Sequence, residues 1–141
     1  QAFLEQWRAE LGIAVEIRQT DFATFLADQD SGRLQAFNAG WIMDYPDPED
    51  ILDLKFHSDS ALNDIGYSNA DVDRLLDQAR TEQDSGARLA LYQEAQELLV
   101  EDAAWLPLYF GVSHVVVKPE VTGWFEPPMV IPRLRFVEVS R

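Results

Sequence analysis

The chain has 141 residues, of which 47% are hydrophobic and 11% aromatic, enough to bury the core of one globular domain. Its 25 acidic and 11 basic residues give a formal net charge of -14, which disfavours nucleic acid and anionic membrane surfaces as partners. The absence of cysteine excludes disulfides, thiolate metal sites and a cysteine nucleophile.

The first third of the sequence alternates helical and strand-like patterns. Gly12 is a natural stop for the first helix, Thr20 or Asp21 can cap the second, and Ser31-Gly32 ends it. No capping residue precedes the first helix, so we expect the natural chain to extend further toward its N-terminus. These patterns predict an α/β layer with helices over 1–10 and 21–30 and strands over 13–17 and 34–41.

The segment 43–50 reads MDYPDPED and interrupts the periodicity. Its prolines at positions 46 and 48 forbid a central strand, and Pro48 is well placed to open a short helix through Leu54. Residues 57–67 are polar and rich in turn formers. The sequence therefore predicts an ordered loop, a short helix and a second loop.

Two helices that form a hairpin are predicted next. Ser68 with Asp71 has the spacing of a capping box for the first helix, and Asp84 or Ser85 starts the second, which runs to about Asp102. The residues expected to be buried are Val72, Leu75, Leu76 and Ala79 on the first helix and Leu89, Tyr92, Ala95, Leu98 and Leu99 on the second.

Two short apolar runs follow the hairpin, 105–110 and 112–117 on either side of Gly111, and both are typical of strands. The last stretch is rich in proline and holds one alternating run, 134–139. We expect four aromatic residues to fill a core between the helix hairpin and a sheet: Tyr92, Trp105, Tyr109 and Phe110.

The loop and the strand before it read Gly40-Trp41-Ile42-Met43-Asp44-Tyr45-Pro46-Asp47-Pro48. This string resembles the G-W-x-x-D-Y-x-x-P signature of the oligopeptide, dipeptide and nickel group of solute-binding proteins of ABC transporters, the family 5 extracellular solute-binding proteins. The flanking strings LGIAVEIRQTDFATFL, VDRLLDQA and RLALYQEAQELLVEDAAWLPLYF are similar to the same family in order and spacing.

The resemblance implies part of the second lobe of a type II periplasmic-binding-protein fold, a mixed sheet flanked by helices, truncated at its N-terminus. Residues 1–117 would be the C-terminal part of this lobe, and 118–141 a tail that returns to the missing first lobe. The implied full-length protein is periplasmic or extracellular, as a lipoprotein or free, and delivers a peptide or another small solute to a membrane permease. It requires no cofactor.

The resemblance also implies the ligand contacts. The position of Asp44 holds a peptide's α-ammonium group in peptide-binding relatives, and Trp41 lines the adjoining pocket. Phe22 matches a pocket aromatic in some relatives, whereas Gly111 stands where some peptide binders have a tyrosine and Asn38 falls where a basic residue can occur in oligopeptide binders. A strand over 38–42 would offer its backbone to an extended peptide. The predicted ligand-binding residues are therefore Phe22, Asn38, Gly40, Trp41, Ile42, Met43, Asp44 and Tyr45.

The residues by themselves are compatible with simpler roles and with different functions. Asp44 alone fits a loop acid that caps its own loop, and Trp41 fits a core residue. The acids of the loop miss the spacing of a calcium loop, so no metal site is predicted. The solute could also be a sugar, a nickel complex or haem. Outside transport, the residues leave open a small hydrolase that uses Asp44 with Asp47 or Glu49, and an interaction domain that self-associates.

Overall fold

A computed structural model describes residues 2–109, 111–112, 114–127 and 134–140. The chain divides into two compact units, residues 1–35 and 36–141. Within the described ranges, none of the helices combines the length and the apolar character that crossing a bilayer requires.

The first unit consists of α1 (Ala2–Leu11) and α2 (Phe22–Asp30). Gly12, at φ 67, ends α1 as predicted, because a left-handed residue stops the helix without a Cβ penalty. Asp21 is the N-cap of α2, and its carboxylate accepts a 3.0 Å bond from the amide of Thr24. Ion pairs from Arg18 and Arg33 to Asp28 tie the segments before and after α2 to this helix.

The strands predicted over 13–17 and 34–41 are wrong, because both segments lack regular secondary structure. The same is true of the described residues within 105–117. A strand is stabilised by hydrogen bonds to a neighbour, and these apolar runs find no ladder partner in the described chain. Many of their side chains are accordingly open to solvent, with Ile17 69% and Val116 96% exposed, although Leu34, Phe37 and Trp41 are half-buried.

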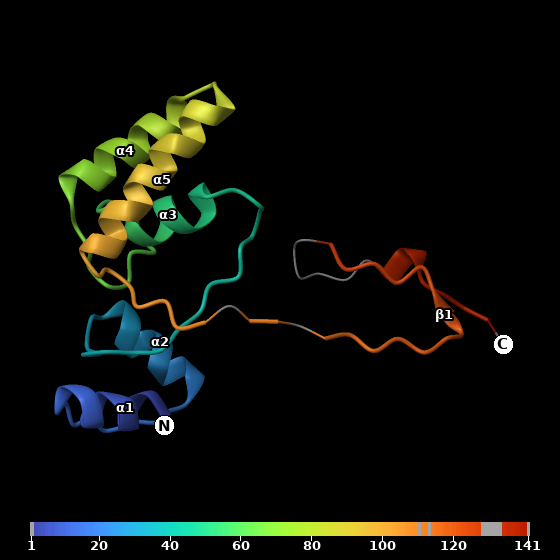
Figure 1. Cartoon of the computed structure of the whole chain (residues 1–141), viewed down its shortest axis with the longest axis horizontal. Helices are drawn as coiled ribbons and strands as arrows, with labels where there is room; N and C mark the ends of the chain where they lie inside the picture. The colour runs from blue at the N-terminus through green and yellow to red at the C-terminus, as the bar shows by residue number, and fades with distance from the viewer. Residues whose placement is uncertain (1, 110, 113, 128–133, 141) are drawn as a thin grey trace. The chain divides into compact units, whose positions relative to one another are not determined.

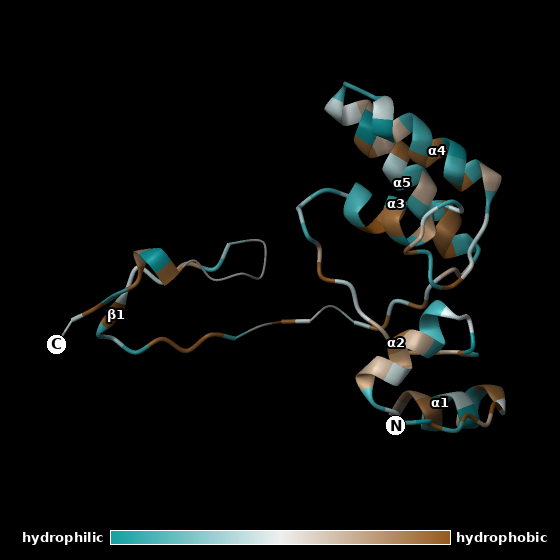
Figure 2. Cartoon of the chain, turned by 180° about the vertical axis from the view of Figure 1, so that it is seen from behind, coloured by the Kyte–Doolittle hydropathy of each residue, from teal (hydrophilic) through white to brown (hydrophobic). Residues whose placement is uncertain are grey.

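The second unit is built on α3 (Glu49–Phe56), α4 (Ala70–Thr81) and α5 (Ser85–Glu101). The last two helices form the predicted hairpin and lie side by side, with α3 packed against both (Figure 1). In Figure 2, α4 carries distinct hydrophilic and hydrophobic faces, as expected of an amphipathic helix. The core consists of Leu52, Phe56, Val72, Leu75, Leu76, Ala79, Tyr92, Ala95 and Leu99.

The helix ends differ slightly from prediction. The capping box at Ser68 is wrong: the N-cap of α4 is Asn69, whose side chain accepts a 2.9 Å bond from the amide of Asp71. Asn is as good an N-cap residue as Ser, so the helix starts one residue later than predicted. Asp84 caps α5 as predicted, accepting from Ala87 at 2.8 Å.

The expected core is only partly correct. Leu89 is 55% exposed, because α5 turns that position away from α3 and α4, and Tyr109 is 80% exposed because no sheet covers it in the described chain. Trp105 is 37% exposed, but the centre of its ring lies 4.6 Å from the centre of the Phe56 ring. Tyr92 is buried as predicted, and the prediction for Phe110 lies outside the described residues.

The tail contains one antiparallel pair, β1 (Val121–Thr122) with β2 (Glu138–Val139), which is the sheet found in the described chain. A 3₁₀ helix, η1 (Leu134–Phe136), occupies the first half of the run that was expected to be extended. Gly123 adopts φ 71 beside this segment. A Cβ built there would lie 1.8 Å from the carbonyl oxygen of Phe136, so the position requires glycine.

Candidate functional site

Trp41 is held at two points by α3. Its indole N–H donates a 2.9 Å hydrogen bond to Oδ2 of Asp50. The ammonium group of Lys55 lies 4.6 Å from the centre of its ring, a cation–π contact. The indole is half-buried, which leaves part of it accessible. The side chain is therefore neither sealed in the core nor free to rotate.

Asp50 also fixes the backbone of the loop. The same Oδ2 that binds the indole accepts a 3.1 Å bond from the amide of Asp44. Asp50 is fully buried in the first turn of α3, where a carboxyl group interacts favourably with the helix dipole. Pro48, at φ -55, immediately precedes this helix and is already in the conformation that starts it.

Lys55 is buried with partners of its own. Its ammonium group donates to the carboxylate of Asp64 at 2.9 Å and to the carbonyl of Leu62 at 3.1 Å. These contacts satisfy a charge that is only 7% exposed and hold it against Trp41. The loop after α3 thus holds Lys55 in place, and Lys55 in turn contacts the ring of Trp41.

Asp47 links the loop to α5. Both of its carboxylate oxygens accept hydrogen bonds of 2.7 Å from the guanidinium of Arg88. These bonds hold the pKa of the Asp47 carboxyl group below its ordinary value. The guanidinium also stacks on Tyr92, with its central carbon 4.9 Å from the ring centre, and lies 3.8 Å from Glu49.

Asp44 differs from its acidic neighbours. Its side chain is exposed, and within the described part of the chain its carboxylate has no hydrogen-bond or ion-pair partner. Asp47 is engaged by Arg88, and Asp50 by the indole and the amide of Asp44. Asp44 is therefore the aspartate of this loop whose carboxylate is available to an external cation.

The other predicted site residues are spread over both units. Gly40, Ile42 and Tyr45 are exposed, and Met43 is half-buried. Asn38 is exposed in a segment without regular structure, and Phe22 lies in the first unit, 72% exposed. Partial burial, followed by the negative charge of Glu49 and Asp50, raises the pKa of the Tyr45 hydroxyl.

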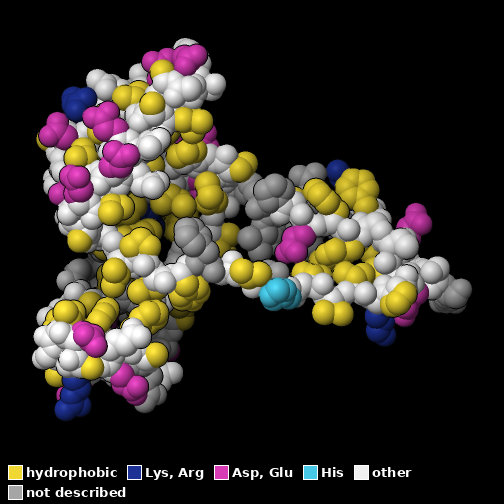
Figure 3. Space-filling model, in the orientation of Figure 1, with side chains coloured by type: hydrophobic (Ala, Val, Ile, Leu, Met, Phe, Trp, Pro, Cys, Tyr) yellow, Lys and Arg dark blue, Asp and Glu magenta, His cyan; other side chains and the backbone are white. Residues whose placement is uncertain are grey.

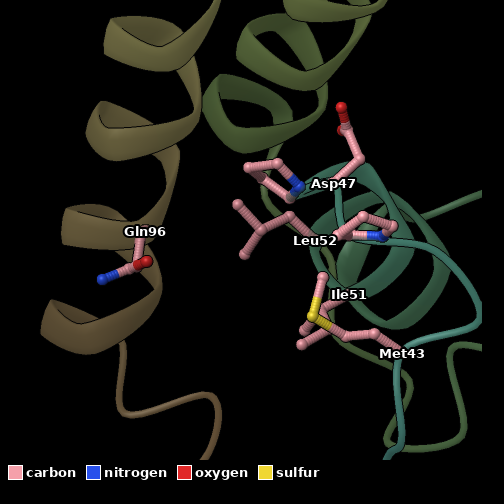
Figure 4. A pocket seen from close by; sticks show the side chains of 7 residues that line it. Met43, Asp47, Ile51, Leu52 and Gln96 are labelled. Carbon is pink, nitrogen blue, oxygen red and sulfur yellow. The ribbon is translucent and has the colours of Figure 1, made fainter. Parts of the chain in front are cut away.

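A mostly apolar cavity of about 420 Å³ opens beside the loop. Figure 4 shows the side chains of Met43, Ile51 and Leu52 on its near side and Gln96 of α5 opposite them. Pro46, Asp47 and Pro48 complete its wall. The loop therefore has one open face with the Asp44 carboxylate and a separate recess against α5.

Three residues that organise the loop were missed from the sequence: Asp50, Lys55 and Arg88. Asp50 and Lys55 are recognisable only in the structure, where both are buried on a helix eight residues long. Buried charges are rarely left without partners, and specific hydrogen bonds engage both side chains. No signal identified Arg88, whose partner lies 41 positions away.

A metal site is not supported by the geometry. No group of three or more His, Asp or Glu side chains with metal-binding placement occurs within residues 2–109, 111–112, 114–127 and 134–140. Acidic side chains are instead dispersed over the visible face of the helix hairpin (Figure 3).

Comparison with known proteins gives a consistent set of relatives. Residues 1–63 match the family model described as bacterial extracellular solute-binding proteins, family 5 Middle. Over 92% of its length, the chain is 31% identical to the dipeptide-binding protein DppE of Bacillus subtilis.

Solved structures show the same relationship. The chain matches the murein tripeptide binding protein MppA of Escherichia coli with a TM-score of 0.85 and 27% identity over 98% of the chain. It matches Haemophilus influenzae OppA, solved in complex with the peptide RPPGFSPFR, with a TM-score of 0.85 and 26% identity over 98% of the chain.

The chain spans about a quarter of the length of these relatives: 24% of the dipeptide-binding protein and 27% of each solved chain. The fold is part of an α/β lobe of the type II periplasmic-binding-protein fold, as predicted. The chain belongs to the bacterial extracellular solute-binding proteins of family 5.

Proposed function

We propose that this chain contributes one wall of a peptide-binding site in an extracytoplasmic binding protein of an ABC transporter. The observation that carries the proposal is the exposed carboxylate of Asp44, which has no partner in the described chain, on a residue whose amide shares its acceptor, Oδ2 of Asp50, with the restrained indole of Trp41. The relatives DppE, MppA and OppA bind a dipeptide, a murein tripeptide and RPPGFSPFR, so their ligands share a peptide character and differ in length.

Asp44 is the proposed partner of the ligand's α-ammonium group. A hydrogen bond between an ammonium group and a carboxylate is about twice as strong as a neutral one. The amide of Asp44 is fixed on Asp50, so the carboxylate is presented from a restrained backbone. A pair of this kind, once enclosed, loses on the order of 2–5 kcal/mol when one partner is truncated.

Trp41 is proposed to line the pocket next to the ammonium group. One part of the indole is engaged by Asp50 and Lys55, and the accessible part offers a flat apolar surface to a ligand side chain. The remaining predicted contacts are backbone groups of Gly40, Ile42, Met43 and Tyr45, with Asn38 and Phe22 as further lining residues. Water-filled pockets would accommodate different side chains.

In the full-length protein we propose two lobes that close on the ligand and then deliver it to a membrane permease. Residues 1–117 would belong to the second lobe and 118–141 to the tail that returns to the first. The protein would act in the periplasm or outside the cell, anchored as a lipoprotein or free.

A hydrolase that uses Asp44 with Asp47 is not favoured, because the Asp47 carboxylate is occupied by two bonds from Arg88. A non-peptide solute is the competing ligand class within the family. Mass spectrometry of the ligand that co-purifies with the full-length protein distinguishes it from a peptide.

The decisive experiment compares trialanine with N-acetyl-trialanine by calorimetric titration of the full-length protein. We expect the acetylated peptide to bind on the order of thirtyfold or more weakly, because it lacks the ammonium group. Asp44→Asn should remove most of this difference, and Asp59→Asn, which neutralises another exposed acid, should leave it unchanged. Equal affinity of the wild-type protein for both peptides would refute the role of Asp44.

A further inference from the structure

We propose that Asp50 is the positioning residue of this loop: it aligns the Trp41 indole and the Asp44 carboxylate for the ligand without touching the ligand itself. The inference deepens the proposed function and rests on it for the identity of the ligand. Its geometric part, the control of the loop by Asp50, stands without a ligand.

A single oxygen atom joins the two proposed contact residues. Oδ2 of Asp50 accepts the indole N–H of Trp41 at 2.9 Å and the amide N–H of Asp44 at 3.1 Å. Because both donors meet at one atom, the indole and the start of the Asp44 side chain are fixed relative to each other. Residues 41–44 belong to no helix or strand that could fix them instead.

Burial makes this restraint strong. Asp50 is 0% exposed, so water does not compete for its oxygens. Its second oxygen, Oδ1, is also buried and has no hydrogen-bond partner within the described chain. An acid this deeply buried, with one oxygen unsatisfied, is costly for stability alone. A positioning role explains why Asp50 is nevertheless present, because its Oδ2 binds the two proposed contact residues, Trp41 and Asp44.

Lys55 completes the restraint from the other end of α3. Its ammonium group contacts the Trp41 ring, while Asp50 binds the indole nitrogen. The helix thus sets the tilt of the ring as well as its direction. A preformed ring and carboxylate spare the ligand the entropy cost of ordering them, which raises affinity without a further contact.

The test uses Asp50→Ala and Asp50→Asn in the full-length protein. Asn keeps a carbonyl oxygen that can accept both N–H groups, whereas Ala keeps none. We expect Asp50→Ala to weaken trialanine binding about five- to fiftyfold, the loss expected when an ordered side chain and a short loop become free. Asp50→Asn should retain affinity within about threefold.

Asp53→Ala is the matched control. Asp53 lies one turn further along α3, is 5% exposed, and its carboxylate binds Arg80 of α4 at 2.6 Å rather than Trp41 or the amide of Asp44. Its removal should destabilise the fold while leaving trialanine affinity unchanged. Should Asp50→Ala fail to fold, Asp50→Ser serves in its place, because the shorter hydroxyl does not reach both donors.

A second readout separates positioning from stability and does not need a ligand. In nitrogen–proton NMR spectra, the indole N–H of Trp41 and the amide of Asp44 should move together in Asp50→Ala, and stay near their wild-type positions in Asp50→Asn and Asp53→Ala. The Trp41 signal is assigned through Trp41→Phe. Unchanged signals in Asp50→Ala would overturn the inference.

The two proposals fail in different ways. If the wild-type protein does not distinguish trialanine from its acetylated form, the role of Asp44 fails, and the NMR result alone decides whether Asp50 controls the loop. If the wild-type protein does distinguish them but Asp50→Ala binds trialanine with wild-type affinity, the positioning role is wrong and Asp44 keeps its role.

Discussion

Arg88 on α5 donates to both carboxylate oxygens of Asp47 at 2.7 Å, which joins the candidate ligand loop to the helix hairpin across 41 positions of sequence. A guanidinium and a carboxylate in this two-bond arrangement have a defined orientation as well as a favourable energy. The loop is consequently anchored on α3 through Asp50, which binds the amide of Asp44, and on α5 through Asp47, while the carboxylate of Asp44 takes part in neither anchor.

Replacing Arg88 should destabilise the second unit. Arg88→Ala removes two charge-assisted bonds from a pair whose side chains are only 23% and 31% exposed, so we expect a loss of about 1.5–3 kcal/mol. Arg88→Lys should recover only part of this, because an ammonium group cannot make the paired arrangement. Urea unfolding monitored by circular dichroism measures both.

The matched control for this loss of charge is Arg74→Ala on α4. Arg74 is 52% exposed and its partner Asp71 is 74% exposed, so this surface pair should contribute less than about 1 kcal/mol. Equal effects of Arg74→Ala and Arg88→Ala would contradict the anchoring role of Arg88.

Stability should fall in acid through Asp47 and Asp102. Hydrogen bonds from Arg88 lower the pKa of Asp47, and bonds from Tyr67 and Asn69 lower that of Asp102, both from an ordinary value of 3.8. The unfolded chain therefore binds these protons more readily than the folded one. The contribution is fully present above the ordinary pKa and is lost as the pH falls through the lowered values.

Unfolding in urea at a series of pH values from about 6 to 2 measures this dependence. Asp47→Asn should lower stability at neutral pH and make the decline in acid shallower, since one of the carboxyl groups with a lowered pKa is gone. A decline as steep as that of the wild-type protein would show that Asp47 is not the group responsible.

The sequence predicted the helices well because their signals are local. The predicted cap at Asp84 and the stop at Gly12 depend on neighbouring residues, and the structure confirms both. Val72, Leu75, Leu76 and Ala79 follow a helical period and are all buried. The short helix after Pro48 was also expected, although it continues to Phe56 rather than ending at Leu54.

The strand predictions failed because a strand forms only with a neighbouring strand as its hydrogen-bond partner, and a local sequence pattern does not reveal that partner. Residues 13–17 have a strand-like alternation, yet without a ladder they stay irregular. Sequence also revealed only some of the residues of the candidate site, for a similar reason. Trp41 and Asp44 are recognisable from a short string, whereas Asp50 and Arg88 act through contacts whose distance in sequence carries no periodic signal.

The helix hairpin should be the most sensitive part of the second unit to loss of volume. Leu76 is 0% exposed between α4 and α5, so Leu76→Ala should cost about 2–5 kcal/mol through lost burial and the cavity left behind. Leu89→Ala, at a position 55% exposed on α5, should change stability by less than about 0.5 kcal/mol. Thermal and urea unfolding test the contrast, and similar losses would contradict the described core.

Gly123 should be indispensable to the pairing of β1 with β2. The residue has φ 71, and an added Cβ would lie 1.8 Å from the carbonyl oxygen of Phe136, so any side chain forces the backbone apart. Gly123→Ala should therefore weaken the 2.9 Å bond from the amide of Ser140 to Glu120. Hydrogen exchange of the Ser140 amide should accelerate in this variant.

The control is Gly111→Ala, which should leave the exchange rate of the Ser140 amide unchanged, because a Cβ at Gly111 meets no atom within 4 Å. Equal acceleration in both variants would mean that the tail responds to glycine loss in general and not to this steric contact.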